Sequence, residues 1–313
     1  MLSGRGRTAL SGSWGLLLGV ILGCWPASGW SQESDTLSLQ LVAGKKPANE
    51  LQVQTVNPGT SVKKTRDEAF RVIPFEQIAP AQRQTAQAIA TSASMYRRLP
   101  TIRCQIDHRA YRFFADHPDV AVSLWRAMGV SKLDMFQTGE YEYEADAKDG
   151  TVGVIQFLHR SQTGCVVQCD GMFKSPVLAK PIQSRALLHV TTHFELDEAG
   201  AQYVTHQADL FVSFPSQTVE TVAKALTPVS NKITDRNFEE ITLFLRMMQL
   251  AMTQQPGWIE QMAGKLDGIM AGRSDSLLQV TAQTYIDEKR RQGEITGEPL
   301  TLEAVKPPVT VTQ

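Results

Sequence analysis

The chain has 313 residues with a formal net charge of −1, and 42% of its residues are hydrophobic and 20% charged. The near-neutral balance provides no basic surface for nucleic acid, so we expect no nucleic-acid partner. The hydrophobic content is sufficient for a buried core, which excludes a chain that is disordered throughout.

The N-terminal residues have the organisation of a secretory signal. Arg5 and Arg7 precede an apolar run over 14–25, which is followed by the small residues 27–29. This order predicts a signal peptide over residues 1–31 and an exported protein, periplasmic or secreted. A retained membrane anchor is the weaker alternative, because the apolar run is shorter than the ~20 residues that span a bilayer.

A lipoprotein is a further alternative. Residues 21–24 read Ile-Leu-Gly-Cys and resemble a bacterial lipobox, in which Cys24 would carry the lipid. The other interpretation is that Cys24 is an apolar residue of the signal and has no further role.

Residues 32–79 are rich in Ser, Asn, Pro, Lys and Gly and have only brief apolar groups, which predicts a polar linker. A helix is expected to begin near Pro80, because proline is favoured at the first position of a helix. We therefore predict that the folded domain covers residues 80–255. Residues 256–313 are expected to form a helical extension followed by a polar tail.

The first part of the predicted domain contains one strand and two short helices. Residues 99–106 favour a strand, and Asp107 can cap a helix that follows. Pro118 should divide this helical segment in two, since proline in a helix interior removes a hydrogen bond and clashes with the preceding turn.

An antiparallel series follows. Alternating apolar and polar residues and turn signals at 149–150 and 197–200 predict strands joined by short connections. These strands are expected at 132–145, 151–159, 165–173, 185–196 and 202–214.

Two further helices are predicted after the strands. Ser216 can cap a short helix that ends before Pro228, and Thr234 or Asp235 can cap a longer apolar helix ending near Met252. This last helix is too short in its apolar content, and Arg246 too central, for a membrane span. We therefore expect no transmembrane segment after signal cleavage.

This order of elements resembles the START-like helix-grip superfamily, also called SRPBCC. The resemblance is carried by LPTIRCQIDHRAYRFFADHPDVAVSLWRAMG at the front and TDRNFEEITLFLRMMQLAM at the back, and it covers about residues 99–252. It implies an α+β fold in which a curved antiparallel sheet wraps around a long C-terminal helix. It also implies a pocket for a hydrophobic, lipid-like ligand between the sheet and that helix.

Apolar residues from both sides would then line the pocket. An ordinary filled core is the alternative interpretation of the same apolar pattern. The candidate residues are Trp125, Phe157, Val212, Phe238, Leu245 and Met248.

Histidines supply the candidate polar groups of the pocket. If the turn at 197–200 pairs Leu196 with Ala201, then His189, His193 and His206 share one face of the sheet. They could be polar groups of a cavity, ordinary hydrogen-bonded or exposed histidines, or, as a minority alternative, ligands of zinc. We therefore predict neither a metal nor a cofactor.

Cysteines and acidic residues leave further alternatives open. Cys104 could pair with Cys165 or Cys169, or all three could be buried thiols. Glu140, Glu142 and Glu144 alternate along one strand, as an exposed charged face or as a general acid and base pair.

The sequence therefore predicts an exported, non-enzymatic protein that binds or carries a hydrophobic ligand. The alternatives are an envelope interaction or structural protein with a filled core, which would have a protein partner, and an enzyme that uses the cavity histidines. No catalytic motif with a recognised spacing is present in the sequence.

Overall fold

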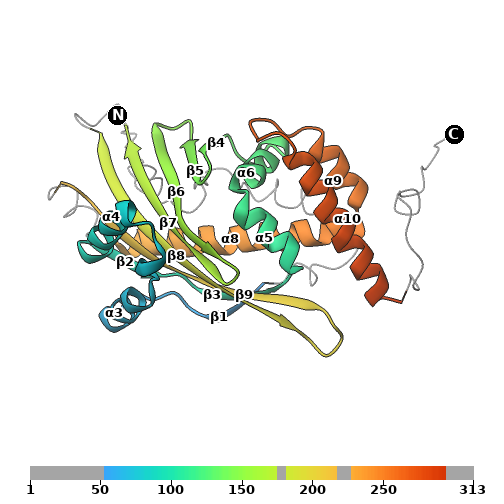
Figure 1. The fold of residues 1–313 in the computed structure, drawn as a ribbon, viewed down its shortest axis with the longest axis horizontal. Coiled ribbons are helices and arrows are strands. Elements are labelled where there is room, and N and C mark those ends of the chain that lie inside the picture. The colour runs from blue at the N-terminus through green and yellow to red at the C-terminus, as the bar shows by residue number, and fades with distance from the viewer. Residues whose placement is uncertain (1–52, 175–180, 217–226, 294–313) are drawn as a thin grey trace, which may run out of the picture.

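The computed structural model describes residues 53–174, 181–216 and 227–293, which form a mixed α+β fold with one large antiparallel sheet (Figure 1). The predicted signal peptide, Cys24, the helix after Ser216 and the polar tail lie outside these ranges.

The sheet is open, and its strands follow the order β1-β3-β9-β8-β7-β6-β5-β4, with β2 paired to another part of β9. All of these pairs are antiparallel. The pairs from β5 to β9 join consecutive strands, as the turn signals predict. The single strand predicted over 132–145 is wrong, because this segment forms the two paired strands β4 and β5. The strands are β1 Gln54–Asn57, β2 Met95–Arg98, β3 Thr101–Gln105, β4 Asp134–Gly139, β5 Glu142–Asp146, β6 Thr151–Ser161, β7 Gly164–Phe173, β8 Ile182–Leu196 and β9 Gln202–Ser213.

One face of the sheet, here called the inner face, carries Ile102, Val167, Ala186 and Leu210 and packs into the main hydrophobic core. Residues from five helices complete this core. Figure 1 shows two of them, α9 and α10, beside α6 at the opposite end of the molecule from α3 and α4. The five helices are α5 His108–Asp116, α6 Pro118–Ala127, α8 Thr227–Gln254, α9 Pro256–Ala263 and α10 Arg273–Arg291.

The opposite face, here called the outer face, is partly covered by three elements from the N-terminal side of the chain. These are α3 Lys63–Val72, the short 3-10 helix η2 Phe75–Gln77 and α4 Pro80–Thr91. They form a second core with strand residues such as Leu187 and Phe211. Among the described residues, the outer face is therefore divided into an area covered by these elements and an area that no helix covers.

This arrangement differs from the polar linker predicted over residues 32–79. Within that range, the segment from β1 to η2 is structured, and Ala69 and Ile78 are buried. The apolar residues of this segment are too few to predict a core by themselves. They become buried because the outer face of the sheet offers them an apolar partner.

The two helices around Pro118 form as predicted. α5 ends at Asp116 and α6 begins at Pro118, where proline occupies the first position of the helix. The side chain of Asp107 caps α5 by accepting a hydrogen bond from the backbone N–H of Arg109 at 2.8 Å.

The start of α8, the long apolar helix expected to end near Met252, was predicted wrongly. α8 begins at Thr227, and Pro228 lies in its first turn, so the helix begins before either of its predicted caps, Thr234 and Asp235. Proline is tolerated there because the first N–H groups of a helix have no partner within the helix. Asp235, one of the two predicted caps, instead forms an ion pair with Arg97 of β2.

No helix in the ranges that the structure describes combines the length and the apolar composition needed to cross a membrane.

Candidate functional site

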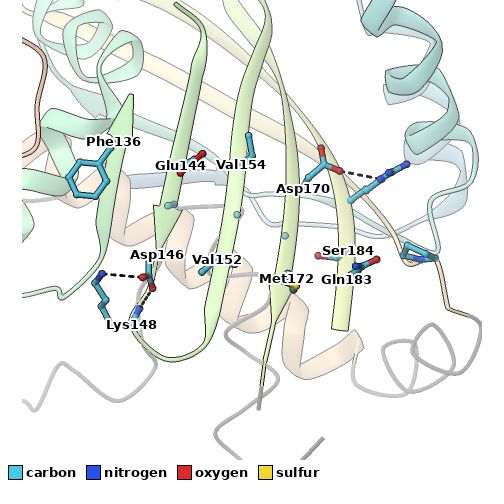
Figure 2. A pocket seen from close by; sticks show the side chains of 15 residues that line it. Phe136, Glu144, Asp146, Lys148, Val152, Val154, Asp170, Met172, Gln183 and Ser184 are labelled. Carbon is cyan, nitrogen blue, oxygen red and sulfur yellow. Dashed lines mark hydrogen bonds and ion pairs between the residues drawn. The ribbon is translucent and has the colours of Figure 1, made fainter. Parts of the chain in front are cut away.

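A groove of about 760 Å³ lies over the uncovered area of the outer face, across strands β4 to β8 (Figure 2). Its volume lies within the range of sites that hold small molecules. Along β8, Arg185 lines the groove, whereas Leu187, two residues further on, is buried in the core beneath α4. The groove therefore begins where the helical cover ends.

The walls of the groove are two rows of side chains that run across the strands. In the first row, Phe136, Glu144, Val154, Asp170 and Arg185 lie opposite one another in register on five consecutive strands. Because side chains alternate along a strand, all five point to the same face. A second row, two residues away, consists of Asp146, Val152, Met172 and Gln183.

Between the two rows lies a third row of small residues. Ala145, Gly153, Gly171 and Ser184 pair in register, and the backbone of each forms part of the groove surface. Because side chains alternate along each strand, the side chains of Ala145 and Ser184 point to the inner face. Glycine within a strand is typical of bends and of places where a ligand approaches the backbone closely.

Apolar side chains are exposed in the groove. Phe136, Val152 and Val154 are 44%, 36% and 37% exposed, respectively. The Phe136 ring packs against the connection between α9 and α10. A Cβ atom added to Gly268 in that connection would lie 2.6 Å from Cε1 of the ring, so the backbone there packs closely on the phenylalanine.

The groove also contains ion pairs. Lys148 Nζ lies 2.6 Å from a carboxylate oxygen of Asp134 and 3.1 Å from one of Asp146. Arg185 Nε lies 3.1 Å from Asp170 Oδ1. Hydrogen bonding to Asp134, and secondarily to Asp146, raises the pKa of Lys148, so this side chain is cationic at neutral pH.

Glu144 differs from the other charged residues of the groove. It is exposed, and it forms no ion pair or side-chain hydrogen bond with any residue in the described part of the chain. Of the three glutamates predicted to form an exposed acidic face, Glu140 and Glu144 are exposed, whereas Glu142 is half-buried. Glu144 is thus a carboxylate with free acceptor oxygens beside the apolar Phe136 and Val154.

The turn between β5 and β6 closes one end of the groove. Lys148 adopts a left-handed backbone conformation with φ of 62°, and Gly150 has φ of 97°. Asp146 stabilises the turn by accepting the backbone N–H of Lys148 at 2.8 Å, which is the main reason that the pKa of Asp146 is lowered. The position of Lys148 is therefore set by local geometry as well as by ion pairs.

Most of the predicted pocket residues lie away from this groove, in the inner core. Trp125, Phe238 and Leu245 are 3%, 6% and 7% exposed. The Trp125 and Phe244 rings meet edge-to-face with 5.4 Å between centroids. Val212 and Met248 belong to the same packed cluster. Phe157 is partly buried and lines a separate cavity of about 40 Å³ between α5 and the sheet.

The prediction that three histidines share one face is wrong. Leu196 pairs with Gln202, and Thr192 with His206, so the register is shifted by one residue from the predicted one. The backbone N–H of Asp197 donates to the carbonyl of Ala201, which continues this register beyond the ends of the two strands. His189 and His193 consequently lie on the outer face and His206 on the inner face.

These histidines therefore do not form one site. In the described ranges of the chain, no group of three or more His, Cys, Asp or Glu side chains is arranged to hold a metal ion. His193 is exposed, whereas His189 is buried and pairs across the strands with Asp209.

His206 is a hydrogen-bonded core residue. Its Nδ1 lies 3.0 Å from the Tyr111 hydroxyl and its Nε2 lies 2.9 Å from Oγ1 of Thr242. Its ring packs on Phe238 with 4.7 Å between centroids. Burial lowers the pKa of His206 to about 4, so the imidazole is neutral over the physiological range.

Asp209 is the centre of a buried polar cluster on the covered part of the outer face. It accepts a hydrogen bond of 2.6 Å from the Tyr96 hydroxyl and two from Arg98, at 2.8 and 3.0 Å. Desolvation lowers the pKa of neighbouring His189, which is therefore neutral beside this cluster. The contacts of Asp209 hold β2 to β9.

The three cysteines of the described ranges are free thiols, so Cys104 forms no disulfide, and Cys165 is half-buried where the second alternative expected a buried thiol. Cys104 and Cys169 are buried, and desolvation raises the pKa of each to about 12. Buried thiols of this kind behave as small apolar residues and not as nucleophiles.

Sequence reasoning missed the residues that line the groove. The available signal was in β6, where Val152 and Val154 are apolar at positions that alternate with the inward-facing Gly153 and Ile155. A strand that is apolar on both faces is typical of a sheet covered on both sides. No single segment indicates that this part of the outer face is uncovered.

No protein-family model matches the chain, and no curated protein matches it. Among solved structures, an uncharacterised protein from Rhizobium leguminosarum is 16% identical, and the match covers 48% of this chain and 94% of that chain. Its TM-score is 0.27, so this likeness carries no argument about fold or function.

Proposed function

We propose that this protein is an exported binding protein for a hydrophobic or amphipathic small molecule, such as a lipid, and that the ligand occupies the groove over β4 to β8. The observation that carries the proposal is the exposure of Phe136, Val152 and Val154 within one groove of about 760 Å³. Apolar side chains gathered in a concave surface are where a ligand gains most from displacing water.

The proposal retains the helix-grip interpretation but places the ligand on the outer face of the sheet, and not between the sheet and α8 as the sequence predicted. α8 contributes to the core against the inner face of the sheet, which supports a helix-grip arrangement. The inner side at Leu245 and Met248 is occupied by packed side chains, whereas the outer side has the groove. We therefore assign core packing to the inner face and ligand binding to the outer face.

The proposed location is the periplasm or the extracellular space, on the evidence of the N-terminal signal pattern. Arg5, Arg7 and the apolar run that follows support export. Acylation at Cys24 would in addition anchor the protein at a membrane surface, close to a source of lipid.

An envelope interaction protein is the second candidate. It is favoured by the packing of Trp125, Leu245 and Met248, because the filled core is the feature that this alternative requires. Exposed apolar residues on a sheet can also form a protein interface. In that case the groove would be covered by a protein partner and would hold no small molecule.

The test is native mass spectrometry of the protein purified from an exporting bacterial host, followed by identification of any molecule released on denaturation. We expect a stoichiometric apolar mass on the wild-type protein. Val154→Arg places a charged side chain in the groove and should abolish it.

Leu196→Arg is the matched control, because Leu196 is 70% exposed on the same sheet but does not line the groove. This variant should retain the ligand. A folded wild-type protein of bare mass would contradict the small-molecule function and favour the interaction protein. Equal ligand loss in both variants would contradict the assignment of the ligand to the groove.

A further inference from the structure

We propose that the ligand of the groove carries a cationic group, an amine or quaternary ammonium on an apolar body, and that Glu144 binds this group. The inference rests on the proposed function, since it specifies the chemistry of the molecule in the same groove.

The first argument is the pairing of charges among the residues that line the groove. Lys148 pairs with Asp146 at 3.1 Å, and Arg185 pairs with Asp170 at 3.1 Å. Glu144 is the charged residue of the lining that remains without an ion partner in the described part of the chain. The groove therefore presents one uncompensated negative charge.

The second argument is the position of Glu144 between apolar neighbours. It lies opposite Phe136 on one side and Val154 on the other, in the register of β4, β5 and β6. Side chains directly opposite each other on adjacent strands have Cβ atoms ~5 Å apart, so one small ligand can contact all three. Figure 2 shows these residues on neighbouring strands of the groove.

The third argument comes from the exposed ring of Phe136. An aromatic face attracts a cation through its negative quadrupole, and this attraction adds to that of a nearby carboxylate. A cationic group beside Glu144 would also lie next to this ring, whereas an anionic group would be repelled by both. Glu144 and Phe136 therefore both favour a cationic group at this position.

An anionic ligand lacks a corresponding partner. Lys148 is held between Asp134 and Asp146, and Arg185 is held by Asp170, which also accepts a hydrogen bond of 2.6 Å from Gln168. An anion that bound either cation would share it with a carboxylate that already contacts it and would be repelled by that carboxylate. The charge arrangement therefore selects against fatty-acid-like ligands.

The test compares three probes with the same alkyl chain and different head groups. Octyltrimethylammonium, octan-1-ol and octanoate are titrated into the full chain at low ionic strength by isothermal calorimetry, below their aggregation concentrations. We expect the cation to bind roughly threefold more tightly than the alcohol, by analogy with exposed ion pairs, and octanoate to bind most weakly. Added salt should reduce the difference, since it screens exposed charges.

Two variants with equal charge change locate the effect. Glu144→Gln should remove the preference for the cation while leaving the binding of octan-1-ol unchanged. Glu140→Gln is the matched control, because Glu140 is exposed on the same hairpin but does not line the groove. The control should retain the preference.

The outcomes separate this inference from the function on which it rests. Equal binding of the cation and the alcohol by the wild-type protein, or an equal effect of both variants, would overturn the role of Glu144 but leave the groove as an apolar binding site. Failure of all three probes to bind the folded protein would overturn the function of the groove, and this inference with it.

Discussion

The Tyr111 hydroxyl donates a hydrogen bond to Nδ1 of His206 across 3.0 Å, and this contact links α5 to β9 inside the main core. The direction follows from the neighbours. Thr242 donates its own proton to the carbonyl of Phe238 at 2.8 Å, so its oxygen accepts from Nε2 of His206. Nδ1 is then the acceptor of the neutral imidazole. Thr192, 3.2 Å from the Tyr111 oxygen, can donate to it and complete the network.

This buried histidine should make the protein less stable in mild acid. Its pKa is about 4 in the folded protein and 6.5, its ordinary value, in the unfolded chain. Between these pH values the unfolded chain binds a proton that the folded protein does not. The contribution of neutral His206 to the free energy of unfolding is therefore complete above pH 6.5. It falls by an amount on the order of 3 kcal/mol as the pH is lowered to about 4.

Urea unfolding between pH 7.5 and 4.5 measures this effect. The free energy of unfolding should fall less steeply with decreasing pH in His206→Gln than in the wild-type protein. His193→Gln, at an exposed position on the neighbouring strand, should retain the wild-type slope. Parallel profiles for all three proteins would contradict the assignment of the pH dependence to His206.

Removal of the Asp209 carboxylate should destabilise the covered part of the outer face. Asp209→Ala leaves the Arg98 charge and the Tyr96 hydroxyl without their partner, and we expect a loss of about 3 kcal/mol. Glu76→Ala, which breaks the ion pair of Arg83 with an 84% exposed carboxylate, should cost less than about 1 kcal/mol. Chemical denaturation compares the two, and equal losses would argue against a structural role for the buried cluster.

Gly150→Ala should be more destabilising than the same change at another glycine with positive φ. A Cβ atom at Gly150 would lie 2.2 Å from the carbonyl oxygen of Lys174, in addition to the strain of φ at 97°. Gly200 has φ of 75° and no atom within 4 Å of an added Cβ, so Gly200→Ala should cost only about 1 kcal/mol. Thermal unfolding should rank the two variants in that order, and the reverse order would contradict the close approach at Gly150.

Met248→Ala tests the assignment of α8 to a packed core. Met248 is fully buried, so its truncation should cost about 2–5 kcal/mol through lost burial and a residual cavity. Met270→Ala, at a residue that is 52% exposed, should change stability by less than about 0.5 kcal/mol. If Met248→Ala retained full stability and gained affinity for octan-1-ol, the inner face would be the ligand site.

Much of the fold could be predicted because local patterns determine it. The cap at Asp107, the break at Pro118 and the alternating strands each depend on residues that are close in sequence. The α3 segment was missed because it has few apolar residues, and their burial depends on a distant sheet face. The early start of α8 was missed because proline can either begin a helix or interrupt one, and the local sequence does not distinguish these roles.

The candidate site could be predicted less well from the sequence, because it depends on the register in which neighbouring strands pair. Because Leu196 pairs with Gln202 and not with Ala201, His206 lies on the face opposite His193. The groove requires five strands to align Phe136 with Arg185, which are far apart in the chain. Alternation predicts that a strand has two faces, but it does not specify which area of a face a helix will cover.

The alternation of β6 has a further consequence for how this protein could diversify. Val152 and Val154 point into the groove, whereas the next residue, Ile155, points into the core. Substitutions at the first two positions can alter what the groove accepts while the packing of the inner face stays the same. Related chains could therefore exchange one ligand for another through a few outward-facing residues and retain an identical scaffold.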